Sequence, residues 1–140
     1  MIGELAIDRN SLIISLTESH LNKNICDAEV AIEGFSSFRA DRLDNVKGGV
    51  IMYINDKWQS QVRVLTAGSI NLIEYLVLYL EKINLILITV YRSPCSDRST
   101  FSLVMNKIDS IVDQEQIFPS IILNGDFNIR EINFKHDFCE

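Results

Sequence analysis

Two acidic residues stand directly after apolar runs, where a buried strand would end. Glu18 follows the run SLIISLT, and Asp126 follows the run SIILNG. Carboxylates at the tips of neighbouring strands are held by rigid backbone at the rim of a sheet, where binding and catalytic sites gather. Two such carboxylates can share a hard cation, because Mg²⁺ prefers oxygen ligands and keeps several waters for a phosphate. The alternative interpretation is that each acid simply ends its strand in solvent.

The residues around Asp126 suit the removal of a proton from water. Gly125 lets the backbone turn beside the acid, and Asn128 lies two residues beyond Asp126. In an extended segment Asn128 would face the same way as Asp126, so its amide would steady a carboxylate that acts as a general base. The alternative for Asn128 is an Asx-turn that ends the strand.

A third apolar run ends in Tyr91 and Arg92, followed by a turn at Pro94. The Tyr91 phenol would lie at the rim of the sheet, and the Arg92 guanidinium would offer a fork that fits a phosphate. A core tyrosine with its hydroxyl at the surface is the alternative. Because Glu18, Tyr91 and Asp126 all stand at strand ends, the sequence favours one shared site over three separate structural roles.

Short strands must position these residues. The apolar pattern predicts strands at 11–16, 34–39, 50–54, 61–65, 72–80, 85–91 and 120–123. The two runs 72–80 and 85–91 are apolar on both faces, as strands inside a covered sheet are, and they form a hairpin that turns at Glu81 and Lys82. Charged residues in this part of the chain, Glu74 among them, argue against a membrane span, because each would cost about 2.5–3.5 kcal/mol at the bilayer centre.

The clearest helix is expected over residues 99–116, with Asp97 or Ser99 as its N-terminal cap. Its apolar stripe consists of Phe101, Val104, Ile108, Ile111 and Val112. A second helix is expected over 2–9, and a loop with at most a helical turn over 18–33. The pair Gly48 and Gly49 suits positive φ or a close approach of the backbone.

The composition indicates one α/β domain dominated by strands. The chain has 140 residues, of which 47% are apolar and 23% are charged, as is usual for a globular protein. A formal net charge of −6 argues against a protein that holds nucleic acid by charge alone. It does not exclude an enzyme that places a cation between carboxylates and a phosphate. Three widely spaced cysteines without a CxxC pair indicate reduced thiols in an intracellular protein.

Four motifs, in this order, resemble the endonuclease/exonuclease/phosphatase family. They are LTESHL at 16–21, ADRLDNVKGGVIMYIND at 40–56, VYRSP at 90–94 and LNGDFN at 123–128. The Thr-Glu-Ser-His form of the first motif, and the Asp-Arg followed by Gly-Gly-Val in the second, most resemble the endonuclease of non-LTR (LINE-type) retrotransposons. Apurinic-site repair endonucleases and neutral sphingomyelinases are more distant members of this family.

The resemblance implies a fold and a set of roles. The fold is a partial four-layer α/β sandwich of the DNase I-like type, with a mixed, mostly antiparallel sheet and flanking helices. Glu18 matches the family's metal-binding glutamate, and Mg²⁺ is the implied cofactor. Tyr91 matches the tyrosine that holds the scissile phosphate, Asp126 the aspartate that orients or deprotonates the attacking water, and Asn128 the asparagine beside it. The metal polarises the phosphodiester and stabilises the developing charge during in-line attack by water. DNA is the implied partner.

The sequence also departs from the family pattern. A Ser-Asp-His signature, which would supply a further carboxylate and the essential histidine, does not follow LNGDFN. Neither His20 nor His136 occupies that position, and both are expected at the surface. We therefore expect residues 1–140 to form a single incomplete domain that is weakly active or inactive. One sheet of the sandwich would be nearly complete, and its uncovered apolar face would favour self-association.

Other interpretations stay open from the sequence alone. The chain could be a non-catalytic transposon-derived remnant or a binding module, and a cellular phosphatase or lipase relative is a third alternative. If the chain is functional as a retrotransposon nuclease, the nucleus is its expected location. The candidate contacts to nucleic-acid phosphates are Arg39, Arg42, Lys47 and Arg92, with Arg42 and Arg92 the strongest.

Overall fold

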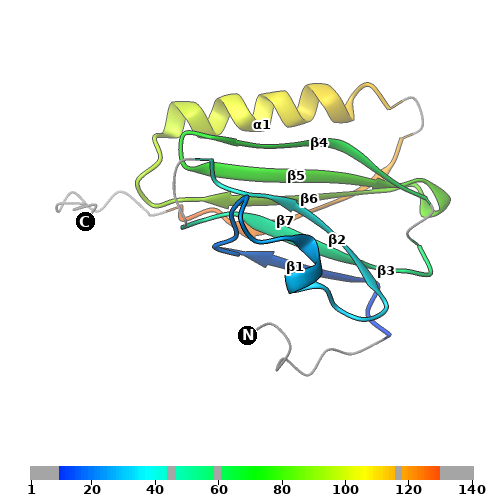
Figure 1. Ribbon diagram of the computed structural model, residues 1–140. Helices are drawn as coiled ribbons and strands as arrows, with labels where there is room; N and C mark the ends of the chain where they lie inside the picture. Colours follow the sequence, from blue (N-terminus) through cyan, green and yellow to red (C-terminus); the bar gives the residue numbers. More distant parts are fainter. Residues whose placement is uncertain (1–9, 44–46, 59–60, 116–117, 130–140) are drawn as a thin grey trace.

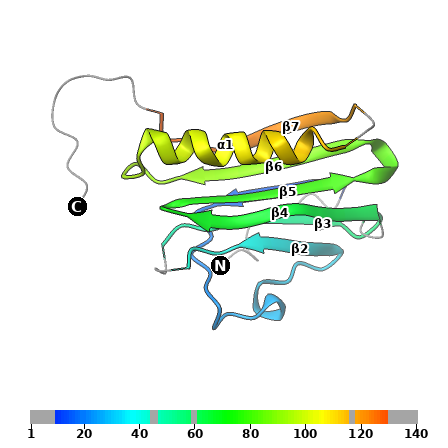
Figure 2. The same cartoon turned by 90° about the horizontal axis from the view of Figure 1, so that it is seen from above.

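Two β-sheets packed face to face form the centre of the structure, and helix α1 lies on the outer side of the larger one (Figures 1 and 2). This computed structural model describes residues 10–43, 47–58, 61–115 and 118–129. Helix and sheets make a mixed α/β arrangement in which most strand pairs are antiparallel. Among these residues, no helix combines the length and the apolar character needed to cross a membrane.

The smaller sheet contains β1 (Ile13–Thr17), β2 (Phe35–Ala40) and β3 (Val50–Asn55), in the order β1-β3-β2. Both pairings are antiparallel, and every residue of the central strand β3 is buried. Between β1 and β2 the chain forms one 3₁₀-helix, η2 (Asp27–Val30). This confirms the prediction of a loop with a helical turn.

The larger sheet contains β4 (Val62–Ile70), β5 (Ile73–Leu80), β6 (Leu85–Arg92) and β7 (Ser120–Asp126), in that order. The 3₁₀-helix η4 (Glu81–Ile83) joins β5 to β6, so the predicted hairpin is confirmed. Strand β7 runs parallel to β6, and the other pairs are antiparallel. The predicted end of β4 at residue 65 is wrong, because a bulge after Val64 lets the small and polar residues that follow keep pairing with β5.

Helix α1 (Arg98–Val112) follows the predicted amphipathic pattern. The Asp97 side chain caps it by accepting a hydrogen bond from the Thr100 backbone N–H. Its buried residues Val104, Ile108 and Val112 pack on one face of the larger sheet. The helix ends at Val112 rather than at residue 116, because the apolar stripe ends there and polar residues follow.

The strands are divided between two separate sheets. This corrects the expectation that the chain would form one nearly complete sheet. The helix layer and the two sheets account for three of the four layers expected (Figure 2). The helix predicted over residues 2–9 lies outside the described residues. Cores form on both faces of the larger sheet: Ile86, Ile88 and Val90 face α1, while Leu87 and Tyr91 face the smaller sheet.

Strand β7 is an edge strand with apolar side chains in solvent. Ile121, Ile122 and Leu123 are 51%, 48% and 47% exposed, and α1 packs on β4 and β5 rather than over them. Apolar edge strands are templates for association with another chain. Self-association through this surface stays a prediction.

Close packing of β7 on β6 requires glycine at one position, which gives a first prediction. Gly125 has φ +145°, and a Cβ there would lie 1.9 Å from the Val90 carbonyl oxygen. Gly34 has φ +84°, with no atom within 4 Å of the corresponding Cβ position. We expect Gly34→Ala to lower the free energy of unfolding by about 1–2 kcal/mol, the cost of a left-handed Ala. Gly125→Ala should lower it by about 3 kcal/mol or more, because the backbone must also move.

Urea denaturation of the two variants measures this difference, with Gly34→Ala as the matched control for φ alone. Equal losses in the two variants would show that β7 is not held against β6 at Gly125.

Candidate active site

Glu18 and Tyr91 come from different sheets and meet where the sheets face each other. Glu18 follows the last residue of β1, and its backbone turns there with φ +53°. The Tyr91 hydroxyl, near the end of β6, donates a hydrogen bond of 2.6 Å to Glu18 Oε1. Tyr91 is only 5% exposed, whereas the Glu18 side chain is 49% exposed. The contact therefore runs from the interior to the surface.

The Tyr91 phenol is held in its protonated form. Burial raises the pKa of Tyr91 well above its usual value, and the hydrogen bond to the Glu18 carboxylate and that carboxylate's negative charge raise it further. The nearby Arg42 guanidinium opposes this rise, and the Asp126 carboxylate adds to it. At neutral pH Tyr91 is therefore a hydrogen-bond donor and not a base.

Asp126 joins the same site through the pairing of β6 with β7. Tyr91 and Asp126 are Cα partners in the parallel register, so their side chains leave the same face of the sheet. The structure thus brings Tyr91 against Glu18 and beside Asp126. The catalytic and metal-binding roles of these residues stay predictions.

Asn128 does not sit in an extended segment. Its φ is +42°, its N–H donates to Asp126 Oδ1 at 3.1 Å, and its side-chain Nδ2 donates to the Arg92 carbonyl oxygen at 2.7 Å. The expectation that Asn128 faces the same way as Asp126 along a strand is therefore wrong, because the chain turns at this point. The Asx-turn alternative describes the geometry, and Asn128 ties this turn to the end of β6.

Arg92 holds the turn between β6 and α1. Its Nε donates to Ser96 Oγ at 3.0 Å, and its Nη2 donates to the Ser96 carbonyl oxygen at 3.2 Å. The guanidinium also lies over the Phe101 ring, 5.1 Å from the ring centroid. One edge of the predicted phosphate-binding fork is therefore used within the protein.

Arg42 is buried in an ion pair, unlike the exposed contact that the sequence suggests. It is 8% exposed, and its Nε and Nη2 donate to the two carboxylate oxygens of Glu74 at 2.8 and 3.0 Å. Glu74, in β5, has no exposed surface and also accepts from Ser69 Oγ at 3.0 Å and from the Gly49 N–H at 3.1 Å. This geometry gives Arg42 a structural use, and its contact with a phosphate stays a prediction.

The ion pair supports the turn that carries Glu18. Gly48 and Gly49 have φ +87° and +88°, and their carbonyl oxygens accept hydrogen bonds from the backbone N–H groups of His20 and Ser19 at 2.8 and 3.3 Å. A Cβ at Gly48 would lie 2.6 Å from the Arg42 guanidinium carbon. The pair of glycines therefore fits between Arg42 and the Glu18 turn, as the prediction of positive φ and close approach required.

Glu74 is the important residue that sequence reasoning missed. In the sequence Glu74 only interrupts an apolar run. Its partner Arg42 lies 32 residues away along the chain. The available signal was the charge itself, since a carboxylate inside a strand buried on both faces needs a partner.

The structure also places Arg39 and His20. Arg39 donates to the carbonyl oxygens of Asn22 and Ile25 and pairs with Asp27 and Asp41. His20 is 54% exposed, and its Nε2 lies 3.8 Å from Glu18 Oε2, whereas His136 lies outside the described residues.

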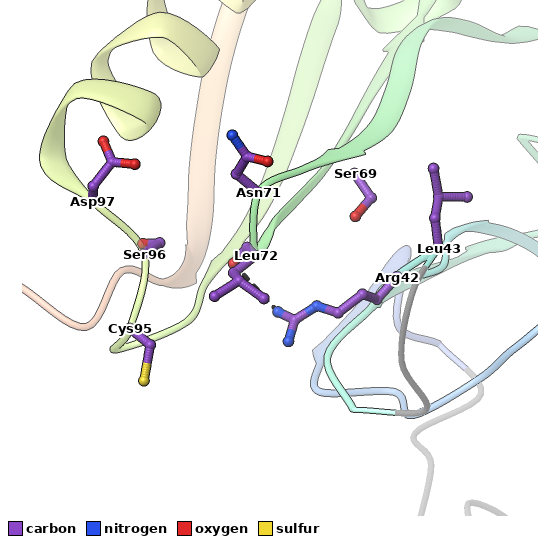
Figure 3. Close-up of a pocket in the computed structure, with 8 residues that line it drawn as sticks. All are labelled: Arg42, Leu43, Ser69, Asn71, Leu72, Cys95, Ser96 and Asp97. Carbon is purple, nitrogen blue, oxygen red and sulfur yellow. Dashed lines mark hydrogen bonds between the residues drawn. The ribbon is translucent and has the colours of Figure 1, made fainter. Parts of the chain in front are cut away.

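A cavity of about 450 Å³ lies beside the ion pair, between the β4–β5 turn and the loop before α1 (Figure 3). Glu18, Tyr91 and Asp126 do not line it; its lining residues are Arg42, Leu43, Ser69, Asn71, Leu72, Cys95, Ser96 and Asp97. Cys26 is a free, exposed thiol.

The donor atoms at the site suit a hard cation. Glu18 and Asp126 provide carboxylate oxygens on either side of Tyr91, and Mg²⁺ is commonly held by one or two carboxylates together with waters and substrate phosphates. Within the described part of the chain, no group of three or more His, Cys, Asp and Glu residues could hold a metal ion. A metal at this site would therefore take most of its ligands from water and substrate, and the metal-binding role of Glu18 stays a prediction.

Solved structures share this fold. No family model and no curated protein matches the chain. The human Nocturnin catalytic domain with bound sulfate anion matches at 12% identity and TM-score 0.54, over 85% of this chain and 52% of that chain. Truncated Caenorhabditis elegans TDP2 matches at 14% identity and TM-score 0.52, over 88% and 52%. TDP2 from C. elegans also matches at 14% identity and TM-score 0.53, over 86% and 39%.

These neighbours have the DNase I-like fold, so the expected fold class is confirmed. The chain spans about half of the length of the first two neighbours. At this level of identity the likeness extends to the fold alone.

The buried pair gives a second prediction. Arg42→Met keeps the aliphatic stem but leaves Glu74 buried without a cation, and we expect it to lower the free energy of unfolding by about 3–5 kcal/mol. Arg63 is the matched control: its side chain is 49% exposed and pairs with Glu81 and Glu115 at 3.0 Å. Arg63→Met should cost about 1 kcal/mol or less. Chemical denaturation compares the two, and similar losses would contradict a special role for Arg42.

Proposed function

We propose that this chain forms part of a divalent-metal-dependent phosphodiesterase that cleaves the backbone of DNA. The observation that carries the proposal is the 2.6 Å hydrogen bond from Tyr91 to Glu18 across the two sheets, with Asp126 in register beside Tyr91. The DNase I-like fold and the four sequence motifs support it. Nuclease and phosphatase sites need an acid for a metal, a donor for the phosphate and an acceptor for a water proton, and these residues supply each type.

The roles follow from the protonation states. Protonated Tyr91 donates a hydrogen bond toward a phosphate oxygen or toward Glu18, and so orients the scissile group. Asp126 accepts a proton from, or orients, the attacking water, and the Asn128 N–H bonded to Asp126 Oδ1 fixes the direction of that carboxylate. Glu18 would hold the Mg²⁺ together with waters, and a bound metal would stabilise negative charge on the phosphate.

Within this class, we propose the DNA-nicking endonuclease of a non-LTR retrotransposon. The support is the sequence resemblance of TESH at 17–20 and of the Asp-Arg and Gly-Gly-Val residues at 41–50. DNA would then be the substrate and the nucleus the place of action. Genomic sequence on both flanks tests this branch: a reverse-transcriptase frame downstream would support it, and an unrelated coding frame would contradict it.

A non-catalytic remnant is the second candidate. The observation in its favour is chemical: the 140 residues contain no Ser-Asp-His signature. Such a chain could keep the fold and its affinity for a cation while losing the ability to cleave.

Metal binding provides the third prediction. Titration with Mn²⁺ in place of Mg²⁺, followed by electron paramagnetic resonance, should show one site. Glu18→Gln and Asp126→Asn should each weaken its affinity about tenfold or more, the scale seen when groups of a metal site are removed. Asp109→Asn, an exposed acid on α1, should leave it unchanged. Equal affinities in all four proteins would contradict the proposed metal site.

Plasmid nicking tests whether the 140 residues are themselves active. With Mg²⁺, we expect the 140-residue chain to convert supercoiled plasmid slowly or not at all, because the histidine block is absent from its sequence. Robust nicking that Asp126→Ala abolishes and Asp109→Asn retains would overturn the expected inactivity and establish the enzyme. Binding of Mn²⁺ without nicking would agree with the expected inactivity.

A further inference from the structure

A small polar cluster lies between the two sheets, just below the candidate active site. Ser15 of β1 faces Thr89 of β6 and Asn124 of β7. Ser15 Oγ lies 2.8 Å from Thr89 Oγ1 and 2.9 Å from Asn124 Oδ1, and Thr89 Oγ1 lies 2.9 Å from Asn124 Oδ1. Thr89 has no exposed surface. The cluster is the place where side chains from β1, β6 and β7 meet through polar atoms.

The cluster is in register with the site. Thr89 and Asn124 are Cα partners, as are Tyr91 and Asp126 two residues later on the same strands. Because side chains alternate along a strand, all four leave the face of the larger sheet that looks toward the smaller one. On β1, Ser15 lies three residues before Glu18, and the strand ends between them at Thr17. The cluster and the site therefore lie at successive positions along the interface between the two sheets.

Apolar packing by itself would not fix the position of β1. The surrounding seam is apolar, with Leu76 and Leu87 of the larger sheet against Met52 of the smaller one. Hydrophobic contact is non-directional, so two such faces tolerate small shifts. Hydrogen bonds require defined distances and angles, and a polar group placed in an apolar seam is costly unless it is paired. The cluster therefore selects one position of β1 over β6 and β7.

The proton count makes every member necessary. Ser15 and Thr89 each have one hydroxyl proton, and Asn124 Oδ1 accepts from both hydroxyls. Two protons serve three contacts, so at any moment the cluster makes two hydrogen bonds. Removing either hydroxyl leaves a single hydrogen bond in the cluster. Removing the Ser15 hydroxyl also breaks the polar contact between β1 and the larger sheet.

We propose that Ser15, Thr89 and Asn124 are positioning residues that fix β1 against β6 and β7, and so set the distance between Glu18 and the Tyr91–Asp126 pair. The functional consequence rests on the proposed phosphodiesterase site. The geometric claim does not, because it concerns the contact between Glu18 and Tyr91 in the protein without metal or DNA.

The experiment observes the Tyr91 hydroxyl proton by NMR at neutral pH without divalent metal. A phenol bonded to a carboxylate at 2.6 Å should give a downfield hydroxyl resonance, assigned by its loss in Tyr91→Phe. Ser15→Ala should abolish this resonance or move it upfield, and Ser15→Thr, which restores a hydroxyl, should keep it. Thr89→Val and Thr89→Ser form a second pair, with a smaller expected contrast because the Ser15–Asn124 hydrogen bond remains.

Ser36→Ala is the matched control, because Ser36 Oγ in β2 bonds the exposed Asp56 at 2.7 Å, away from the seam. A Ser15→Ala shift no larger than that of Ser36→Ala would overturn the proposal. Loss of amide dispersion in Ser15→Ala would also overturn it, because the cluster would then serve stability and not position. A chain that fails to bind Mn²⁺ contradicts the proposed metal site and leaves this result unchanged.

Discussion

A guanidinium and a carboxylate buried together at the seam of the two sheets hold the site-bearing turns in place. Glu74 receives four hydrogen bonds, two from Arg42 and one each from Ser69 and the Gly49 backbone. A carboxylate can be fully buried only when its lone pairs are satisfied in this way. The segments after β2, before β3 and at the β4–β5 turn must therefore come together around the Arg42–Glu74 ion pair.

The pair and the active site are neighbours through Tyr91. The Arg42 guanidinium carbon lies 5.7 Å from the centroid of the Tyr91 ring, and Glu74 and Tyr91 are Cα partners on β5 and β6. One row across the larger sheet thus holds Glu74, Tyr91 and Asp126. The ion pair supports the glycine turn, the glycine turn supports Glu18, and Glu18 accepts from Tyr91, so the chain of contacts closes on itself.

This arrangement changes the meaning of the sequence motifs. The Asp-Arg and Gly-Gly residues at 41–49 look like a phosphate-binding motif, because arginines and glycine pairs are common in such sites. In the structure the arginine and the glycines build the support under Glu18, and Glu18, Tyr91 and Asp126 form the candidate site. A motif can therefore be characteristic of a fold because it shapes the site, without touching the ligand.

Most of the strands and the helix could be predicted from the sequence, because these depend on local patterns. Apolar runs located β3, β5 and β6, the 3.6-residue stripe located α1, and Glu18, Tyr91 and Asp126 stood out as polar groups at strand ends. The length of β4 was not visible, since residues 66–69 are small or polar and pair only because β5 lies beside them.

The pairing between distant residues was decided by tertiary structure. Division of the strands into two sheets depends on which apolar faces meet, and no local pattern encodes that choice. The Arg42–Glu74 pair, the turn at Asn128 and the contacts of Ser15 with Thr89 and Asn124 join residues separated by between 32 and 109 positions, the Asn128 turn reaching back 36 positions to Arg92. Side-chain type alone cannot distinguish a buried partner from a solvent-exposed charge, because burial is a property of the packed chain.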